Sequence, residues 1–244
     1  MAKEYSTEEL ARRFIDHREI QNLMGKYALL VMICKDADLV KNFWVPAAEN
    51  PVLAVNNGYY VGTDAISSYY SAIAENYAKK ASAAKEVFPK QLGGKPAGEL
   101  FGVGEDHPRP LTSPIIEIAE DEKSAKGLWQ VMGVDNSLTE YGPLSTWCWG
   151  YAAADFLYEK KSWKIWHLCF FQELVTPCAQ DWTKPFSLEK DPVFSGFSGS
   201  CLPEPTIKRN LYQAYSPKRE YTAPPRIPEP YRTFRETFSY GPND

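Results

Sequence analysis

The sequence predicts an α+β fold in which helices come first and a sheet of antiparallel strands follows. Three observations lead to this prediction. Apolar residues recur at helical spacing in the first third of the chain, a hairpin signal interrupts the helical stretches, and apolar and polar residues alternate after residue 110. Runs of helices followed by runs of strands are typical of α+β domains rather than of alternating α/β folds.

Residues 6–36 have the pattern of a long first helix. Ser6 or Thr7 is expected to cap it, and Glu9 lies three residues after Ser6, as in a capping box. The residues at helical spacing that should face the core are Ile20, Leu23, Met24, Tyr27, Leu30 and Val31. These features predict an amphipathic helix with one buried stripe.

A short helix, a hairpin and a second long helix are expected next. Residues 36–44 predict the short helix, and residues 51–62 predict two strands joined by the turn Asn-Asn-Gly. Residues 63–88 are rich in alanine and predict a long helix. Its expected buried stripe is Ile66, Tyr69, Tyr70, Ile73 and Tyr77.

The second half of the chain has strand periodicity. Residues 89–110 hold several glycines and prolines and predict a long loop, which usually has a functional reason. Residues 111–134 and 144–174 each predict two strands around a charged turn, because apolar residues alternate in both arms. We expect one α+β domain over residues 1–176. Residues 177–244, rich in proline and aromatic residues, predict an ordered arm on this domain or on a neighbouring subunit, with a flexible tail as the alternative.

Composition excludes several classes of protein. The chain has 244 residues, a net charge of −4 and scattered basic residues, so we expect no nucleic-acid partner. The charged N-terminus and the lack of long apolar runs predict a cytoplasmic protein with no membrane partner. Five cysteines without a Cys-x-x-Cys pair, and three widely separated histidines, predict neither a disulfide framework nor a metal site.

Three stretches resemble the SnoaL-like superfamily, whose cone-shaped fold is shared by nuclear transport factor two, ketosteroid isomerase and scytalone dehydratase. They are EIQNLMGKYALLVMICKDADLVKNFW, SPIIEIAEDEKSAKGLW and WGYAAADFLYEKKSWKIWHL. The resemblance covers roughly residues 8–172 and implies a curved antiparallel sheet around three helices, with a small-molecule pocket in the cone. It also implies catalysis without a cofactor and assembly into a homodimer or homotrimer, since relatives bury the outer sheet face. Trp166 and Phe170 would otherwise be exposed on that face.

Four residues are candidates for catalysis. Counting in twos along the last strand puts His167 on the same face as Trp163 and Ile165, which the resemblance places inside the cone; a core histidine is the alternative. The other candidates are His107, on a lid over the pocket or in solvent, Tyr27, as a hydrogen-bond donor or a core aromatic residue, and Asp38, as a base or a helix cap.

Five further residues are candidates for substrate binding. They are Tyr59, Trp129, Trp149, Tyr151 and Asp155. Only one of Tyr59 and its neighbour Tyr60 can face inward, since side chains alternate along a strand. Asp155 lies in an aromatic strand and needs a partner if it is buried.

The resemblance and these residues favour a cofactor-free lyase that acts on a hydrophobic, hydroxylated and aromatic small molecule. A histidine or aspartate would remove a proton while tyrosine hydroxyls stabilise an oxyanion, with loss of water or formaldehyde. The aromatic content also suggests the lyases that cleave lignin-derived diarylpropanes. The alternatives are an isomerase or cyclase of a steroid or polyketide, and a non-catalytic binding or assembly module, because this fold hosts all three.

Overall fold

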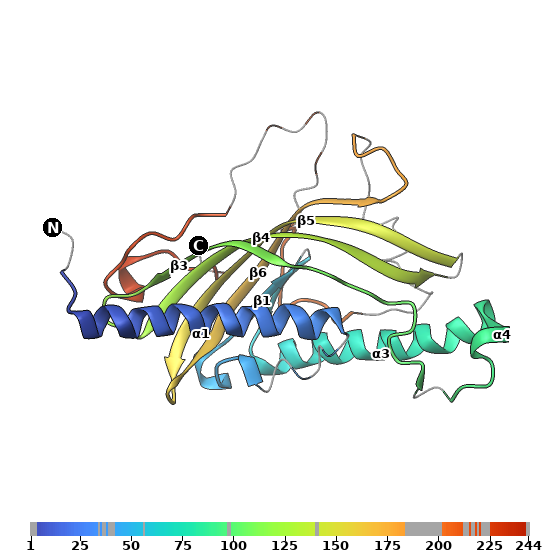
Figure 1. Cartoon of the computed structure of the whole chain (residues 1–244), viewed down its shortest axis with the longest axis horizontal. Helices are drawn as coiled ribbons and strands as arrows, with labels where there is room; N and C mark the ends of the chain where they lie inside the picture. Colours follow the sequence, from blue (N-terminus) through green and yellow to red (C-terminus); the bar gives the residue numbers. More distant parts are fainter. Residues whose placement is uncertain are drawn as a thin grey trace.

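A computed structural model describes residues 4–33, 35, 38, 42–55, 57–96, 99–139, 142–183, 202–211, 215, 218, 220 and 225–242. Two long helices and a curved sheet form its body (Figure 1). The described helices are α1 (Thr7–Met32), η2 (Ala47–Glu49), α3 (Thr63–Val87), α4 (Pro89–Leu92) and η5 (Phe234–Glu236). The described strands are β1 (Val52–Val55), β2 (Gly58–Val61), β3 (Leu111–Ile118), β4 (Ser124–Thr139), β5 (Gly142–Glu159), β6 (Ser162–Pro177) and β7 (Ile207–Lys208).

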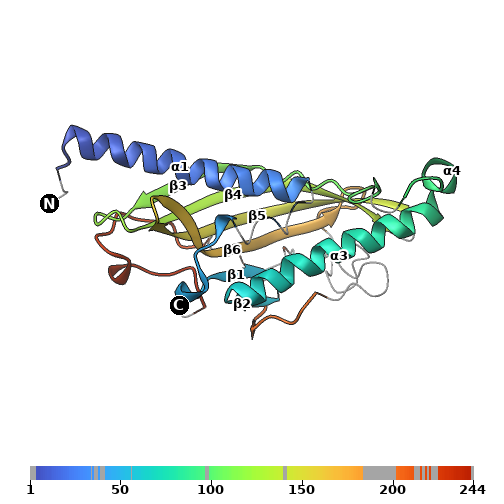
Figure 2. The same cartoon turned by 90° about the horizontal axis from the view of Figure 1, so that it is seen from below.

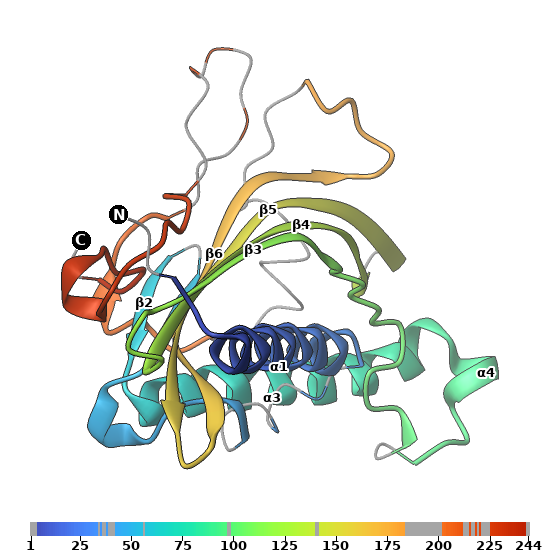
Figure 3. The same cartoon turned by 60° about the vertical axis from the view of Figure 1, so that its left-hand side comes forward.

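The strands form one sheet in the order β3-β4-β5-β6-β1-β2-β7. The described pairs are antiparallel, except that β1 runs parallel to β6. The sheet is therefore mixed and not wholly antiparallel as predicted, because the early hairpin joins the open side of the last long strand. The sheet arches over α1 and α3 (Figure 3). This arrangement confirms the predicted α+β fold of cone shape.

Both long helices lie on the concave side of the sheet (Figure 2). The predicted capping box begins α1, since Ser6 accepts from the Glu9 amide and Glu9 accepts from the Ser6 amide. The stripes predicted from helical spacing are buried at Ile20, Met24 and Tyr27 on α1 and at Ile66, Tyr70 and Tyr77 on α3. The predicted short helix at residues 36–44 falls mostly outside the described residues.

The two faces of the sheet carry separate apolar clusters. The inner cluster packs between the sheet and the helices, and includes Tyr60, Trp129, Phe156, Trp163, Ile165 and Leu168. The outer cluster includes Val52, Ala54, Tyr59, Leu128, Ala153, Cys169 and Tyr240. Of the tyrosine pair in the hairpin, Tyr60 therefore faces the helices and Tyr59 faces outward.

A β-bulge in β6 changes which side chains face the cone. Ile165 and His167 pair with successive residues of β5, which leaves Trp166 as an extra residue between them. Such an insertion reverses the alternation of side chains beyond it. The prediction that His167 shares the cone interior with Trp163 and Ile165 is wrong for this reason. Leu168, on the predicted outward face, belongs to the inner core.

The described parts of the C-terminal arm contact the chain's own sheet. β7 pairs with β2, and residues 225–242 lie across the outer face, where Tyr240 is 6% exposed. The Glu120 amide donates to the Tyr231 carbonyl at 3.0 Å, which ties the arm to the turn between β3 and β4. The domain boundary at residue 176 stays a prediction. No helix in the described part of the chain is long and apolar enough to cross a membrane.

Candidate active site

A cavity of about 180 Å³ lies between the concave face of the sheet and the two long helices. Its walls combine apolar and aromatic side chains with a few polar groups. They are Tyr27, Ala28, Val31, Leu53, Val55, Tyr69, Tyr70, Ile73, Tyr77, His107, Arg109, Leu111, Val131, Phe170 and Gln172. A mostly apolar cavity with converging polar groups is the usual form of a small-molecule site.

The loop before β3 brings His107 to this cavity. Asp106 and Asn136 exchange two backbone hydrogen bonds, of 3.0 and 2.8 Å, and these hold the loop against β4. The close approach depends on Gly133, because a Cβ at this position would collide with the carbonyl oxygen of Pro108. The long loop predicted from glycine and proline content therefore positions a functional candidate.

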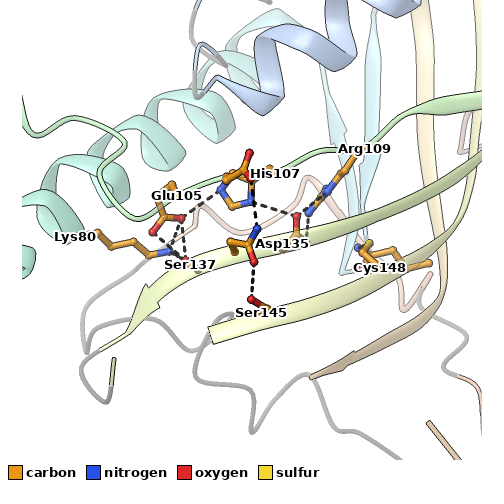
Figure 4. Close-up of polar contacts among 11 residues, drawn as sticks. Lys80, Glu105, His107, Arg109, Asp135, Ser137, Ser145 and Cys148 are labelled. Carbon is orange, nitrogen blue, oxygen red and sulfur yellow. Dashed lines mark hydrogen bonds and ion pairs between the residues drawn. The ribbon is translucent and has the colours of Figure 1, made fainter. Parts of the chain in front are cut away.

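His107 and Asp135 form a buried pair at the cavity wall (Figure 4). His107 Nδ1 lies 3.2 Å from Asp135 Oδ1, and Arg109 donates to both oxygens of the same carboxylate at 3.0 and 2.5 Å. Burial raises the pKa of Asp135, but Arg109 and His107 outweigh this effect and hold the pKa below its ordinary value. Asp135 therefore stays ionised and can fix the orientation of the imidazole ring.

A second carboxylate lies against the other nitrogen of His107. Glu105 Oε2 is 3.2 Å from His107 Nε2, and Glu105 also accepts from Lys80 at 3.1 Å and from Ser137. Burial raises the pKa of Glu105, yet the contacts with His107, Lys80 and Ser137 lower it overall. Each ring nitrogen of His107 therefore faces a carboxylate, to which it can donate when it carries a proton.

Tyrosine hydroxyls supply further polar groups in the cavity. The Tyr27 and Tyr70 hydroxyls are 3.2 Å apart, one from each long helix. The Tyr77 ring is stacked near His107, with ring centroids 5.9 Å apart. Phenol groups in an apolar wall can donate to a substrate oxygen. The cavity therefore combines a proton-transfer group with hydrogen-bond donors.

Two of the four residues predicted to be catalytic meet at the cavity. His107 and Tyr27 line it. His167 does not, since it lies on the outer face of the sheet under the arm. Asp38 is exposed and is not among the cavity-lining residues. The catalytic roles predicted for these four residues stay predictions.

The residues predicted to bind substrate lie outside the cavity wall. Tyr59 and Tyr151 pack in or against the outer cluster, and Trp149 contacts Trp182 on that same face. Trp129 is buried in the inner core, 2% exposed. Asp155 is fully buried beneath the arm. Strand alternation in the sequence predicts which of these residues share a face of the sheet. It does not predict which of the two faces points into the cone.

Asp155 belongs to a second polar cluster, on the far side of the sheet from the cavity. It accepts from Lys126 at 2.6 Å and pairs with His167 Nδ1 at 2.8 Å. From the arm, Ser239 and the Tyr240 amide also donate to it. The described residues hold no group of three or more His, Cys, Asp and Glu side chains arranged to bind a metal.

Sequence reasoning missed Asp135, Arg109 and Glu105 as site residues. Asp135 directly follows the strand segment predicted at residues 111–134, and the structure extends that segment as β4 to Thr139. A buried carboxylate in a strand needs partners. The partners themselves come from a loop 26 to 28 residues away along the chain. Nothing in the spacing of that loop indicates which strand residue it meets.

No protein-family model matches the chain, and no curated protein sequence matches it. Solved structures do resemble it. A protein from Novosphingobium aromaticivorans, provisionally named a scytalone dehydratase, has 13% identity and a TM-score of 0.51, over 72% of this chain and 96% of its own. A hexachlorocyclohexane dehydrochlorinase from Novosphingobium barchaimii has 16% identity and a TM-score of 0.48, over 71% and 97%. The first of these confirms the resemblance drawn from the sequence at the level of the fold.

Proposed function

We propose that the protein is a cofactor-independent lyase that eliminates water from a hydrophobic, hydroxylated small molecule. The observation that carries this proposal is His107, held by Asp135 at 3.2 Å in the wall of a cavity lined by tyrosines. A histidine oriented by a buried carboxylate is a common arrangement for proton transfer. The surrounding apolar wall strengthens its electrostatic interaction with a bound substrate.

The chemistry follows from the groups around the ring. In its neutral form His107 keeps the Nδ1 proton on the side of Asp135, and Nε2 removes a carbon-bound proton from the substrate. The C–O bond breaks as the double bond forms. Glu105, 3.2 Å from Nε2, stabilises the imidazolium that forms, and the imidazolium gives the Nε2 proton to the departing hydroxide, which leaves as water. Tyr27 and Tyr70, whose hydroxyls are 3.2 Å apart, would donate to the oxygen that gains charge in the transition state.

The size of the cavity limits the reacting part of the substrate. A cavity of about 150 Å³ holds benzene, so the 180 Å³ found here suits one substituted ring. A two-ring diarylpropane derived from lignin, which would lose formaldehyde by related proton transfers, needs more room than this cavity offers. We therefore propose that one ring of the substrate reacts inside the cavity. A diarylpropane would be the largest substrate, with its second ring outside the cavity.

Assembly and location remain proposals. The predicted homodimer or homotrimer depended on Trp166 and Phe170 facing outward from the sheet. In the structure, Trp166 packs on Phe234 of the arm with ring centroids 4.6 Å apart, and Phe170 packs on Tyr27 in the cavity. Trp149, 37% exposed, is an outer-face residue that a second subunit would cover. A cytoplasmic location is likewise a prediction from the sequence.

Incubation with a panel of hydroxylated aromatic compounds, followed by mass spectrometry, tests the proposed activity. A lyase yields a product lighter than its substrate by one water, whereas an isomerase yields a product of equal mass. We expect His107→Gln to abolish this product and His17→Gln, on the far part of α1, to retain it. A product of equal mass, or undiminished turnover in His107→Gln, contradicts the proposal.

A further inference from the structure

A groove of about 580 Å³ lies between α1 and the start of β3, next to the cavity that holds His107. The groove and the cavity share two wall residues, Ala28 and Leu111. Helix α1 runs beside β3 along this part of its length (Figure 2). The lining of the groove is Gln21, Asn22, Met24, Gly25, Lys26, Ala28, Leu29, Pro110, Leu111, Pro114 and Trp129. The two spaces are therefore neighbours with a common boundary.

The helix side of this groove contains a glycine, Gly25, at a position where a helix does not favour glycine. It lies in the interior of α1, where glycine is a poor helix former. Apart from the adjacent residues and the backbone of the helix itself, no atom lies within 4 Å of the position that a Cβ would take, and the backbone of Gly25 is not in the left-handed region. Neither close packing nor backbone conformation therefore requires glycine here. Its effect on the structure is to leave the groove open.

The neighbours of Gly25 extend this open face. Gln21 and Ala28 lie one turn away on either side, so the three residues share one side of the helix. Ala28 on α1 and Leu111 on β3 line both the groove and the cavity, so on the helix side only a methyl group stands at their boundary. The apolar walls end at a polar rim, where Lys26 is the one charged residue among the described lining residues.

We propose that this groove is a second substrate subsite, which binds the part of the substrate that does not fit in the cavity. The inference rests on the proposed function, since the cavity would hold the reacting ring. The substrate class is an elongated, neutral molecule with a second ring or apolar chain, which would contact Trp129 and the proline-rich wall. A polar group at its far end would meet Gln21, Asn22 and Lys26. Gly25 and Ala28 then determine how long a substrate the protein accepts.

Filling the groove from Gly25 tests this proposal. The probes are p-cresol, with one ring, and 4-benzylphenol, with two, and calorimetry measures the dissociation constant of each. We expect the wild type to bind 4-benzylphenol at least tenfold more tightly than p-cresol. Gly25→Leu should remove this preference by weakening 4-benzylphenol while leaving p-cresol unchanged. Because leucine favours helix more than glycine does, the variant should unfold at no lower temperature than the wild type.

Ala11→Leu is the matched control, since it adds the same side chain to an exposed position of α1 that lines neither space. If Gly25→Ala weakens the binding of 4-benzylphenol less than Gly25→Leu does, the weakening grows with the volume of the added side chain. Wild-type protein that binds 4-benzylphenol no more tightly than p-cresol, or a Gly25→Leu variant that keeps the preference, overturns the subsite. Failure of the lyase proposal is seen separately, as absence of turnover in protein that still shows the length preference.

Discussion

Each face of the sheet holds a cluster that contains a histidine, an aspartate and a basic residue, and the surroundings of the two clusters differ. On the concave face, His107 pairs with Asp135, and Arg109 neutralises the carboxylate. On the convex face, His167 pairs with Asp155, and Lys126 is the cation. In both clusters the imidazole Nδ1 faces an aspartate within 3.2 Å. The first cluster lines a cavity, whereas the second is covered by the C-terminal arm.

The surroundings of Lys126 show what the covered cluster contributes. Lys126 and Asp155 are both fully buried, and aromatic rings of the arm surround the ammonium group. Its Nζ is 4.4 Å from the ring centroids of Phe234 and Phe238. Such contacts stabilise a desolvated cation. A histidine–aspartate pair therefore indicates a candidate site only where a cavity reaches it, and elsewhere it joins segments of the chain.

The largest expected effect is on turnover in the cavity cluster. Asp135→Asn removes the charge that orients His107, so we expect turnover to fall by about 10²–10⁴-fold. Steady-state kinetics on the compound identified by the mass-spectrometric panel measures this. Asparagine has nearly the same shape as aspartate, so this variant tests the effect of the charge. Turnover within about twofold of wild type would remove Asp135 from the mechanism.

Next in size is the loss of stability in the covered cluster. Asp155→Asn leaves Lys126 buried without its counter-ion, so we expect the free energy of unfolding to fall by about 3–5 kcal/mol. Urea unfolding followed by tryptophan fluorescence measures the change, with Glu19→Gln on the exposed side of α1 as the control. The double variant Lys126→Met, Asp155→Leu should lose less, because no unpaired charge remains. An Asp155→Asn variant as stable as the control would show that the pair contributes little.

A smaller effect is expected from the tyrosines of the two faces. Tyr27→Phe removes one hydroxyl from the cavity, and we expect turnover to fall by about tenfold, the worth of one hydrogen bond. Tyr59→Phe, on the outer face, is the matched control and should retain wild-type turnover. If Tyr27→Phe has the same turnover as Tyr59→Phe, the hydroxyl of Tyr27 has no part in the reaction.

The smallest effect concerns acid stability. The pKa values of Asp135 and Glu105 lie below their ordinary values in the folded chain. Carboxylates of this kind stabilise the fold above their unfolded pKa, and the stabilisation is lost as the pH falls through the folded pKa. We expect the free energy of unfolding to decrease from about pH 5 downward. In Asp135→Asn the free energy of unfolding should decrease less steeply with falling pH than in the wild type. The same pH dependence in both proteins would argue against the lowered pKa of Asp135.

The sequence predicted the architecture better than the site. Local signals sufficed for α1, whose capping box Ser6–Glu9 forms as expected, and for the hairpin around Gly58. Strand alternation failed at one residue, because the bulge at Trp166 moved His167 to the outer face. A bulge depends on the pairing of two strands, and no single strand shows it in its own sequence.

The site depended on contacts between distant segments. His107 was identified as a candidate from its type and its position before a strand, but its partner Asp135 was not. Their contact exists because Gly133 allows the loop to approach β4. Contacts of this kind follow from the assembled fold, whereas periodicity reports only on local structure and on which residues share a face.

The most direct test of this account compares His107→Gln with His167→Gln in turnover and in unfolding by urea. We expect His107→Gln to remain folded and to lose turnover by about 10²-fold or more. His167→Gln should keep turnover within about threefold while its free energy of unfolding falls by about 1–3 kcal/mol, the cost of a lost buried hydrogen bond. Lost turnover in a stably folded His167→Gln, together with retained turnover in His107→Gln, would contradict the assignment of the cavity as the active site.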